Sequence, residues 1–167
     1  MTTTDRPTDL SARTSRLVRW FACIGLLIMT AIIGWQVFAR YVMNASPAWA
    51  EQAALLLMIW YVMFAAAAGV REGFHIRIGV VENALPERLQ RLVRTLGHIL
   101  VGLFGVAMLV WGAELVSATW AHDIPTLGLP RGVAYVPMPV SGLLILLFSI
   151  EHIVALWKGR EVRDAWN

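Results

Sequence analysis

Apolar residues dominate four long stretches of this chain, and polar residues gather in the short stretches between them. A helix needs about 20 largely apolar residues to cross the hydrocarbon core of a membrane. Four segments meet that requirement, at approximately Leu17–Phe38, Pro47–Val70, Leu92–Ala118 and Pro139–Trp157. The pattern therefore predicts an all-α integral membrane protein, a bundle of four transmembrane helices.

The four predicted spans use most of the 167 residues, so little chain is left for anything else. The remainder is a short polar start, three connections and a tail, which leaves no room for a separate soluble catalytic domain. We therefore expect residues 1–167 to form one transmembrane domain. The first span is expected to be an uncleaved anchor, because its apolar run is longer than a signal-peptide core and continues through Trp35 and Tyr41.

Composition and charge agree with this class and add an orientation. The chain is 58% apolar and 15% charged, as in membrane proteins. Of its 14 Lys and Arg residues, only Arg40 and Arg131 fall on one side of the predicted bundle, and all others fall on the opposite side. Cytoplasmic loops carry the excess of Lys and Arg. Both termini are therefore predicted to be cytoplasmic, and the basic charge requires no nucleic-acid partner.

The start of the second span has a helix-start pattern and a candidate binding residue. Ser46 is expected to cap this helix and Pro47 to open its first turn. Glu51 would then lie in the first turn, where the helix dipole favours a carboxylate, and Trp49 suits the outer membrane interface. Two interpretations remain open for Glu51, an interfacial cap and a contact with a partner protein.

The connection between the second and third spans alternates between polar and apolar residues. Residues alternate from Phe74 to Val80, and after Pro86 leucines recur at helical spacing, opposite arginines. This predicts an amphipathic cytoplasmic connection that lies along the membrane and contacts lipid headgroups.

Four polar residues at the start of this connection have two possible roles. Arg71 and Glu72 are adjacent and oppositely charged at a helix end, and His75 and Arg77 follow them. They can anchor the chain to headgroups, or they can supply hydrogen-bond donors and an acceptor to a partner subunit. The residues alone leave both roles open.

The centres of the spans carry no charged side chain, and Glu114 and Glu151 lie near span ends. Transport chemistry normally needs ionisable groups or broken helices near the midplane, so an autonomous ion-coupled carrier is not expected. No enzymatic motif is present either. Ala65 and Gly69 form a small-xxx-small face that would let another helix approach closely.

Two histidines raise a cofactor question. His98 and His152 would both lie toward the cytoplasmic side, and two facing imidazoles can hold a b-type haem. A haem-binding membrane anchor subunit of an oxidoreductase is therefore the alternative function. Hydrogen-bonded histidines are the simpler interpretation, and we expect no cofactor and no metal, since Cys23 is the single cysteine. A small multidrug-type exporter would need a carboxylate deep in its first span, and this span has none.

Several motifs, taken in order, resemble the small permease subunit of tripartite ATP-independent periplasmic (TRAP) transporters. They are Trp49-x-Glu51, Val70-Arg71-Glu72-Gly73 with His75-Ile76-Arg77, Leu85-Pro86, and Pro137-x-Pro139 with Ser141-Gly142. The resemblance covers most of the chain. The family often has a second acid directly after the position of Glu51, where this chain has Gln52.

The resemblance implies a non-catalytic subunit of the bacterial inner membrane. Its partners would be a large permease subunit, which carries the sodium and substrate sites, and a periplasmic binding protein that delivers an organic acid, either a carboxylate or a sugar acid. The chain would scaffold the large permease during sodium-coupled uptake. The expected partner interface consists of Trp49, Glu51, Arg71, Glu72, His75 and Arg77.

Overall fold

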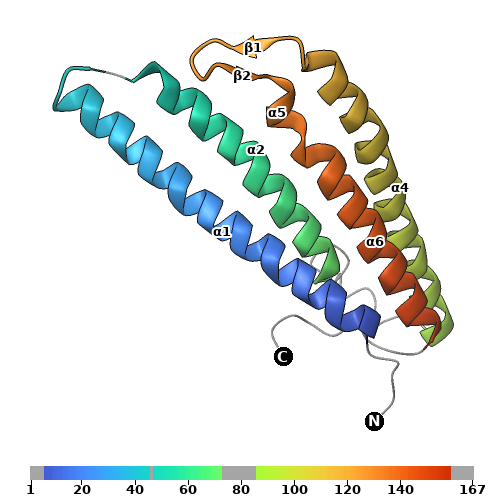
Figure 1. Cartoon of the computed structure of the whole chain (residues 1–167). Helices are drawn as coiled ribbons and strands as arrows, with labels where there is room; N and C mark the ends of the chain where they lie inside the picture. The colour runs from blue at the N-terminus through green and yellow to red at the C-terminus, as the bar shows by residue number, and fades with distance from the viewer. Residues whose placement is uncertain (1–5, 46, 73–85, 159–167) are drawn as a thin grey trace.

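Four long helices make up most of the computed structural model, which describes residues 6–45, 47–72 and 86–158. The helices are α1 (Arg6–Tyr41), α2 (Ala48–Arg71), α4 (Glu87–Thr119) and α6 (Pro137–Trp157) (Figure 1). Each contributes to a segment that is long and apolar enough to cross a membrane, at Thr14–Tyr41, Ala48–Arg71, Leu89–Thr119 and Gly132–Trp157. The predicted number of transmembrane helices is confirmed.

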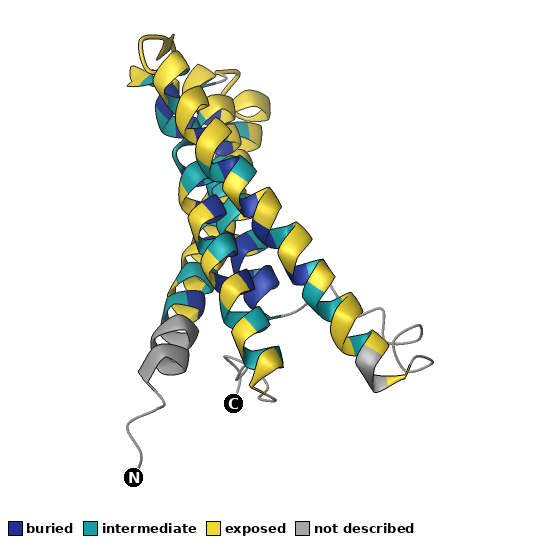
Figure 2. Ribbon diagram, turned by 90° about the vertical axis from the view of Figure 1, so that its right-hand side faces the viewer, coloured by how far each residue is buried: buried dark blue, intermediate teal, exposed yellow. Residues whose placement is uncertain are grey.

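The helices lie in a row rather than around a common axis. The α2 helix packs against α1 on one side and against α6 on the other, and α4 packs against α6. The order across the row is therefore α1, α2, α6, α4 (Figure 1). Most of the helix surface is exposed, and the buried residues follow the contacts inside the row (Figure 2). Such a row offers two edges, α1 and α4, to whatever surrounds it.

All four helix starts differ from the predicted spans, and α1 begins at Arg6 rather than Leu17 and α6 at Pro137 rather than Pro139. The α2 helix begins at Ala48, one residue later than expected, because Pro47 is extended and occupies the cap position without a side-chain hydrogen bond. Ser46 lies outside the described residues. The α4 helix begins at Glu87, directly after Pro86 and ahead of the predicted Leu92. Hydropathy marks only the part of a helix that suits lipid, and good helix formers such as Glu and Arg extend the helix beyond it.

The α4 and α6 helices touch through their backbones. A Cβ atom added to Gly105 would lie 2.8 Å from the carbonyl oxygen of Gly142, and one added to Gly142 would lie 2.7 Å from that of Gly105. Lipid gives apolar helices no hydrophobic reason to associate, so close packing between small residues holds them together. The buried core next to this contact consists of Ala67, Val70, Met108, Ile145 and Phe148.

The α1 helix is the least buried of the four. Only 6% of the residues in its most apolar stretch are buried inside the chain. Its contact with α2 includes aromatic pairs, since the ring of Phe21 lies 5.4 Å from that of Phe64 and 6.3 Å from that of Trp60, between ring centroids. The buried residues of α1 that the structure describes are small, namely Ser15, Ala22 and Ala39.

A small ordered connection joins α4 to α6. Strands β1 (Asp123–Ile124) and β2 (Leu129–Pro130) form an antiparallel hairpin, and the short helix α5 (Gly132–Tyr135) follows. The Trp60 indole donates a hydrogen bond to the Val133 carbonyl oxygen at 3.2 Å, which fastens this connection to α2. We call this end of the row the hairpin end. The start of α1 and the end of α6 lie at the other end (Figure 1).

Candidate functional site

Polar side chains from all four long helices meet at the end of the row opposite the hairpin. This polar network consists of Arg19, Arg71, Glu72, His98, Glu151 and His152. The α1 and α4 helices begin near this end, whereas α2 and α6 finish there. The polar residues that flank the four apolar spans are therefore brought to one level, which we call the network end.

An ion pair connects α1 to the last turn of α2. The Arg19 guanidinium Nη1 donates to the Glu72 carboxylate Oε1 at 2.5 Å, and the two side chains are only 22% and 7% exposed. A charge-assisted hydrogen bond of this kind is stronger than a neutral one, and partial burial protects it from the screening that weakens surface pairs. The pair therefore contributes to holding the otherwise exposed α1 helix in place.

Arg71 is directed into the row, where it approaches α6. Its side chain is fully buried, and its Nε atom lies 3.9 Å from Glu151 Oε2. This distance indicates an electrostatic attraction rather than a hydrogen bond. A buried guanidinium without a nearby carboxylate is costly in free energy. Glu151 therefore stabilises the position of the α2 end against α6.

His152 caps α2 from the neighbouring helix. Its Nε2 atom lies 2.7 Å from the backbone carbonyl oxygen of Arg71. Because a carbonyl oxygen can only accept, Nε2 must carry the proton and donate it. The last carbonyl groups of a helix lack partners within the helix. His152 satisfies one of them from the neighbouring helix.

The two histidines stack on each other. The rings of His98 and His152 are nearly parallel, 6° apart, with centroids separated by 4.6 Å. An imidazole binds a metal in the plane of its ring, so stacked rings do not direct their nitrogen atoms at a common iron between them. The Nε2 atom of His152 is also engaged with Arg71. This geometry does not fit the haem alternative, and it links α4 to α6 instead.

The residues predicted for a partner interface divide between the two ends of the row. Arg71 and Glu72 belong to the polar network, where their described contacts are made within this chain. Trp49 and Glu51 are exposed in the first turn of α2, at the hairpin end, and the position predicted for Glu51 in that turn is confirmed. The two pairs are separated by most of the 24 residues of α2. His75 and Arg77 lie outside the described residues.

The remaining sequence-predicted features have less support within the chain. Ala65 is exposed and Gly69 is half-buried, whereas the buried small residues of this turn are Ala67 and Ala68. A close approach by another helix at Ala65 stays a prediction. Among the described residues, no group of three or more His, Cys, Asp or Glu side chains is placed to hold a metal ion.

Sequence reasoning missed the pairings of this network. Arg19 was predicted only as one of the cations that set the orientation, and His152 as a candidate haem ligand or a hydrogen-bonded residue without a named partner. A usable signal was available for the ion pair, since Arg19 and Glu72 have opposite charges at the same ends of two consecutive antiparallel spans. Which helices are neighbours in the row, however, is not encoded in any local pattern.

Comparison with known proteins gives one consistent result. The sequence model of the family described as "Tripartite ATP-independent periplasmic transporters, DctQ component" matches residues 29–159. That range begins inside α1 and includes α2, α4 and α6. Every member of the polar network except Arg19 lies within it.

Individual relatives carry matching names. The chain is 25% identical over 131 residues to the sialic acid TRAP transporter small permease protein SiaQ of Vibrio cholerae, covering 78% of this chain and 75% of that protein. It is 26% identical over 149 residues to the C4-dicarboxylate TRAP transporter small permease protein DctQ of the same species, covering 75% and 64%. It is also 25% identical over 138 residues to the sialic acid TRAP transporter permease protein SiaT of Haemophilus influenzae, covering 82% of this chain but 22% of that longer protein.

Proposed function

The chain belongs to the DctQ component, the small permease subunit, of the tripartite ATP-independent periplasmic transporters, and from this premise we propose that it scaffolds the large permease subunit during sodium-coupled uptake of an organic acid. A small permease is a transport subunit and not an enzyme. The protein is a multi-pass protein of the inner membrane, and this family works together with a large permease subunit.

The observation that carries the scaffold role is where the polar side chains lie. A carrier binds its ion and substrate near the midplane, with ionisable side chains or interrupted helices. In this chain the polar network lies at the ends of the helices, and it connects all four of them. Such an arrangement supports a chain that keeps its shape while its partner moves.

The proposal includes an orientation, with the network end and both termini in the cytoplasm. The described cations at that end include Arg16, Arg91, Arg94 and Lys158. The excess of Lys and Arg marks the cytoplasmic side of a membrane protein. Residues 1–167 would form one transmembrane domain, and the amphipathic connection between α2 and α4 would lie along the cytoplasmic lipid surface.

The predicted interface residues take two different roles in this proposal. Trp49 and Glu51, both exposed, would contact a partner directly on the periplasmic side. Arg71 and Glu72 would act through the polar network, by fixing the end of α2 from which a connection with His75 and Arg77 departs. Substituting Glu72 would then let the end of α2 shift. The connection would start from a different position, and its contact with the partner would be weaker.

The substrate class and the third component are also part of the proposal. Two relatives are named for sialic acid and for C4-dicarboxylates, which are a sugar acid and carboxylates. We therefore expect an organic acid as substrate and a periplasmic binding protein that delivers it. The choice among acids would rest with those other chains, because the span centres of this one carry no charge.

Reconstitution into proteoliposomes tests the proposal. Uptake driven by a sodium gradient is measured with this chain alone, with the large permease and binding protein alone, and with all three. We expect uptake only from the complete set. Uptake by this chain alone would refute the non-transporting role, and full uptake without it would refute the scaffold role.

A further inference from the structure

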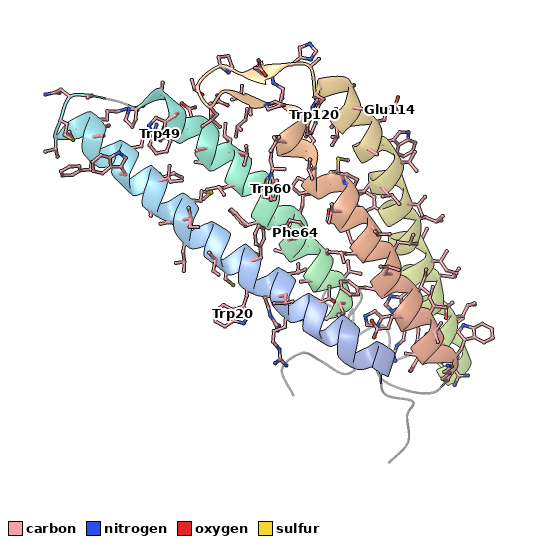
Figure 3. All side chains as sticks on the ribbon, in the orientation of Figure 1. Trp20, Trp49, Trp60, Phe64, Glu114 and Trp120 are labelled. Carbon is pink, nitrogen blue, oxygen red and sulfur yellow. The ribbon has the colours of Figure 1, made fainter. Side chains whose placement is uncertain are left out.

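An exposed carboxylate stands on the edge of the row, on α4. Glu114 points away from the other helices (Figure 3), and its side chain is exposed. Among the described residues, the Glu114 carboxylate has no hydrogen bond and no ion pair. The Ser117 hydroxyl, one turn later, donates to the backbone carbonyl oxygen of Glu114 at 2.7 Å and leaves the carboxylate unaffected.

Glu114 lies at the boundary of the apolar layer. Between Arg94 and Glu114, α4 carries no Asp, Glu, Lys or Arg. This stretch is about 30 Å long at about 1.5 Å per residue, which equals the thickness of the hydrocarbon core. Glu114 is thus the first charged side chain that α4 presents on leaving the membrane toward the hairpin end.

The direction of the side chain makes this position unfavourable for a negative charge. Cα–Cβ bonds tilt toward the start of a helix, so the side chain of Glu114 is directed back toward the apolar layer. A positively charged partner would remove this penalty.

Neighbouring residues make the surface suitable for protein contact. Trp111, one turn before Glu114, is 65% exposed, and tryptophan is enriched among the residues that dominate binding energies. Ser117 is small and exposed, so it would let another helix approach closely. We name Trp111, Glu114 and Ser117 the Glu114 face.

The opposite edge of the row carries a cation at the corresponding level. Between Arg19 and Arg40, α1 carries no charged side chain, and the exposed Arg40 lies in the last turn of α1. The partial negative charge at the end of a helix favours a cation in that turn. Of the two edge helices, α4 is therefore the one whose charged side chain at this level is an acid.

We propose that the Glu114 face docks a transmembrane helix of the large permease subunit, with an arginine or lysine of that helix paired to Glu114. This inference rests on the proposed function, because it takes the large permease as the partner. Charge-assisted hydrogen bonds from a guanidinium or ammonium group are strong at a dehydrated boundary. They would fix both the depth and the rotation of α4 against the permease.

The first test measures association of the whole complex in lipid nanodiscs. Glu114→Gln keeps the shape of the side chain and removes its charge, and we expect it to weaken binding of the large permease about tenfold. Asp123→Asn is the matched control, since Asp123 is an exposed acid at the same end of the row, on β1. It should bind like the wild type. Thermal unfolding of both variants alone should be unchanged, which separates docking from folding.

The second test places a photo-crosslinking amino acid at Ser117, and at Leu27 on α1 as the control. Leu27 is 70% exposed on the opposite edge. We expect the probe at Ser117 to reach the large permease and the probe at Leu27 to reach lipid. Wild-type binding by Glu114→Gln would overturn the ion pair, and a Ser117 probe that reaches only lipid would overturn the docking. If even the wild-type chain does not bind the large permease, the proposed function itself fails.

Discussion

The two outer helix pairs of the row are held together by different means. In the α4/α6 pair, Gly105 and Gly142 bring the backbones into direct contact. The α1/α2 pair combines aromatic contact between Phe21 and Phe64 with small buried residues such as Ala22, and the Arg19–Glu72 ion pair joins the two helices at the network end. Lipid provides no hydrophobic force between helices, so backbone contact is the tighter connection. We infer that α4 and α6 form the rigid half of the protein.

This difference gives the polar network a distinct task in each half. In the α4/α6 pair the His98–His152 stack adds to an interface that is already close-packed. In the α1/α2 pair, the Arg19–Glu72 ion pair adds a polar contact to an interface that, among the described residues, has no glycine contact like that of Gly105 and Gly142. Substitutions should therefore rank by the half in which they fall and by whether they affect backbone or side-chain contact.

The largest effect is expected for Gly142→Leu. A side chain at this position would have its Cβ atom 2.7 Å from both the Gly105 oxygen and the Leu109 nitrogen, so α4 and α6 must move apart. Such overpacking costs about 1–3 kcal/mol or more. The yield of monodisperse protein and its thermal unfolding would measure the loss. Gly34→Leu on α1 is the control, because nothing lies within 4 Å of an added Cβ there. Equal behaviour of the two variants would contradict a tight α4/α6 contact.

The next effect is expected at the ion pair. Glu72→Gln leaves Arg19 in a partly buried position without its carboxylate, which should cost about 1–3 kcal/mol of stability and lower co-purification of the large permease. If Glu72 only anchored the chain to headgroups, removing an acid would be harmless or even helpful. A double-mutant cycle with Arg19→Gln should give a favourable coupling energy of about 1 kcal/mol. A coupling of zero would refute the pair as the closure of α1 onto α2.

A smaller effect is expected for the histidines, with an order between them. His152→Ala removes the donor to the Arg71 carbonyl oxygen and should cost about 1 kcal/mol. His98→Ala removes the ring stacking and the packing of a buried side chain, but no described hydrogen bond of its Nδ1 atom, so its thermal unfolding should change less. His152→Gln can still donate a hydrogen bond and should recover part of the loss. A larger effect for His98→Ala would show that stacking, rather than capping, is the main contribution.

The smallest effect is expected for Gly25→Ala on α1. The added Cβ atom would lie 3.1 Å from the Cβ atom of Tyr61, a contact that α1 can relieve by a slight shift because it has no other close neighbour helix. Gly105→Ala, whose Cβ atom would meet backbone at 2.8 Å, should cost more when the same thermal assay is applied. The reverse order would mean that α1 and α2 form the rigid half.

The sequence predicts the elements well and their neighbours poorly. Span positions follow from apolar length, and the place of Glu51 follows from a helix start, because both depend on adjacent residues. The hairpin of β1 and β2 was missed, since two-residue strands leave almost no alternation to detect. The stacking of His98 on His152 requires α4 and α6 to be neighbours. The close contact between Gly105 and Gly142 makes them neighbours, and these two residues are far apart in the sequence.

The most direct test of the central claim measures a distance inside this chain while the transporter works. Spin labels at Leu27 on α1 and Leu103 on α4, both exposed, would be introduced with Cys23→Ser, and the complete complex would be studied in nanodiscs by pulsed electron paramagnetic resonance. A fixed scaffold predicts the same distance distribution with and without sodium and substrate. A new distance that appears when both are added would contradict it.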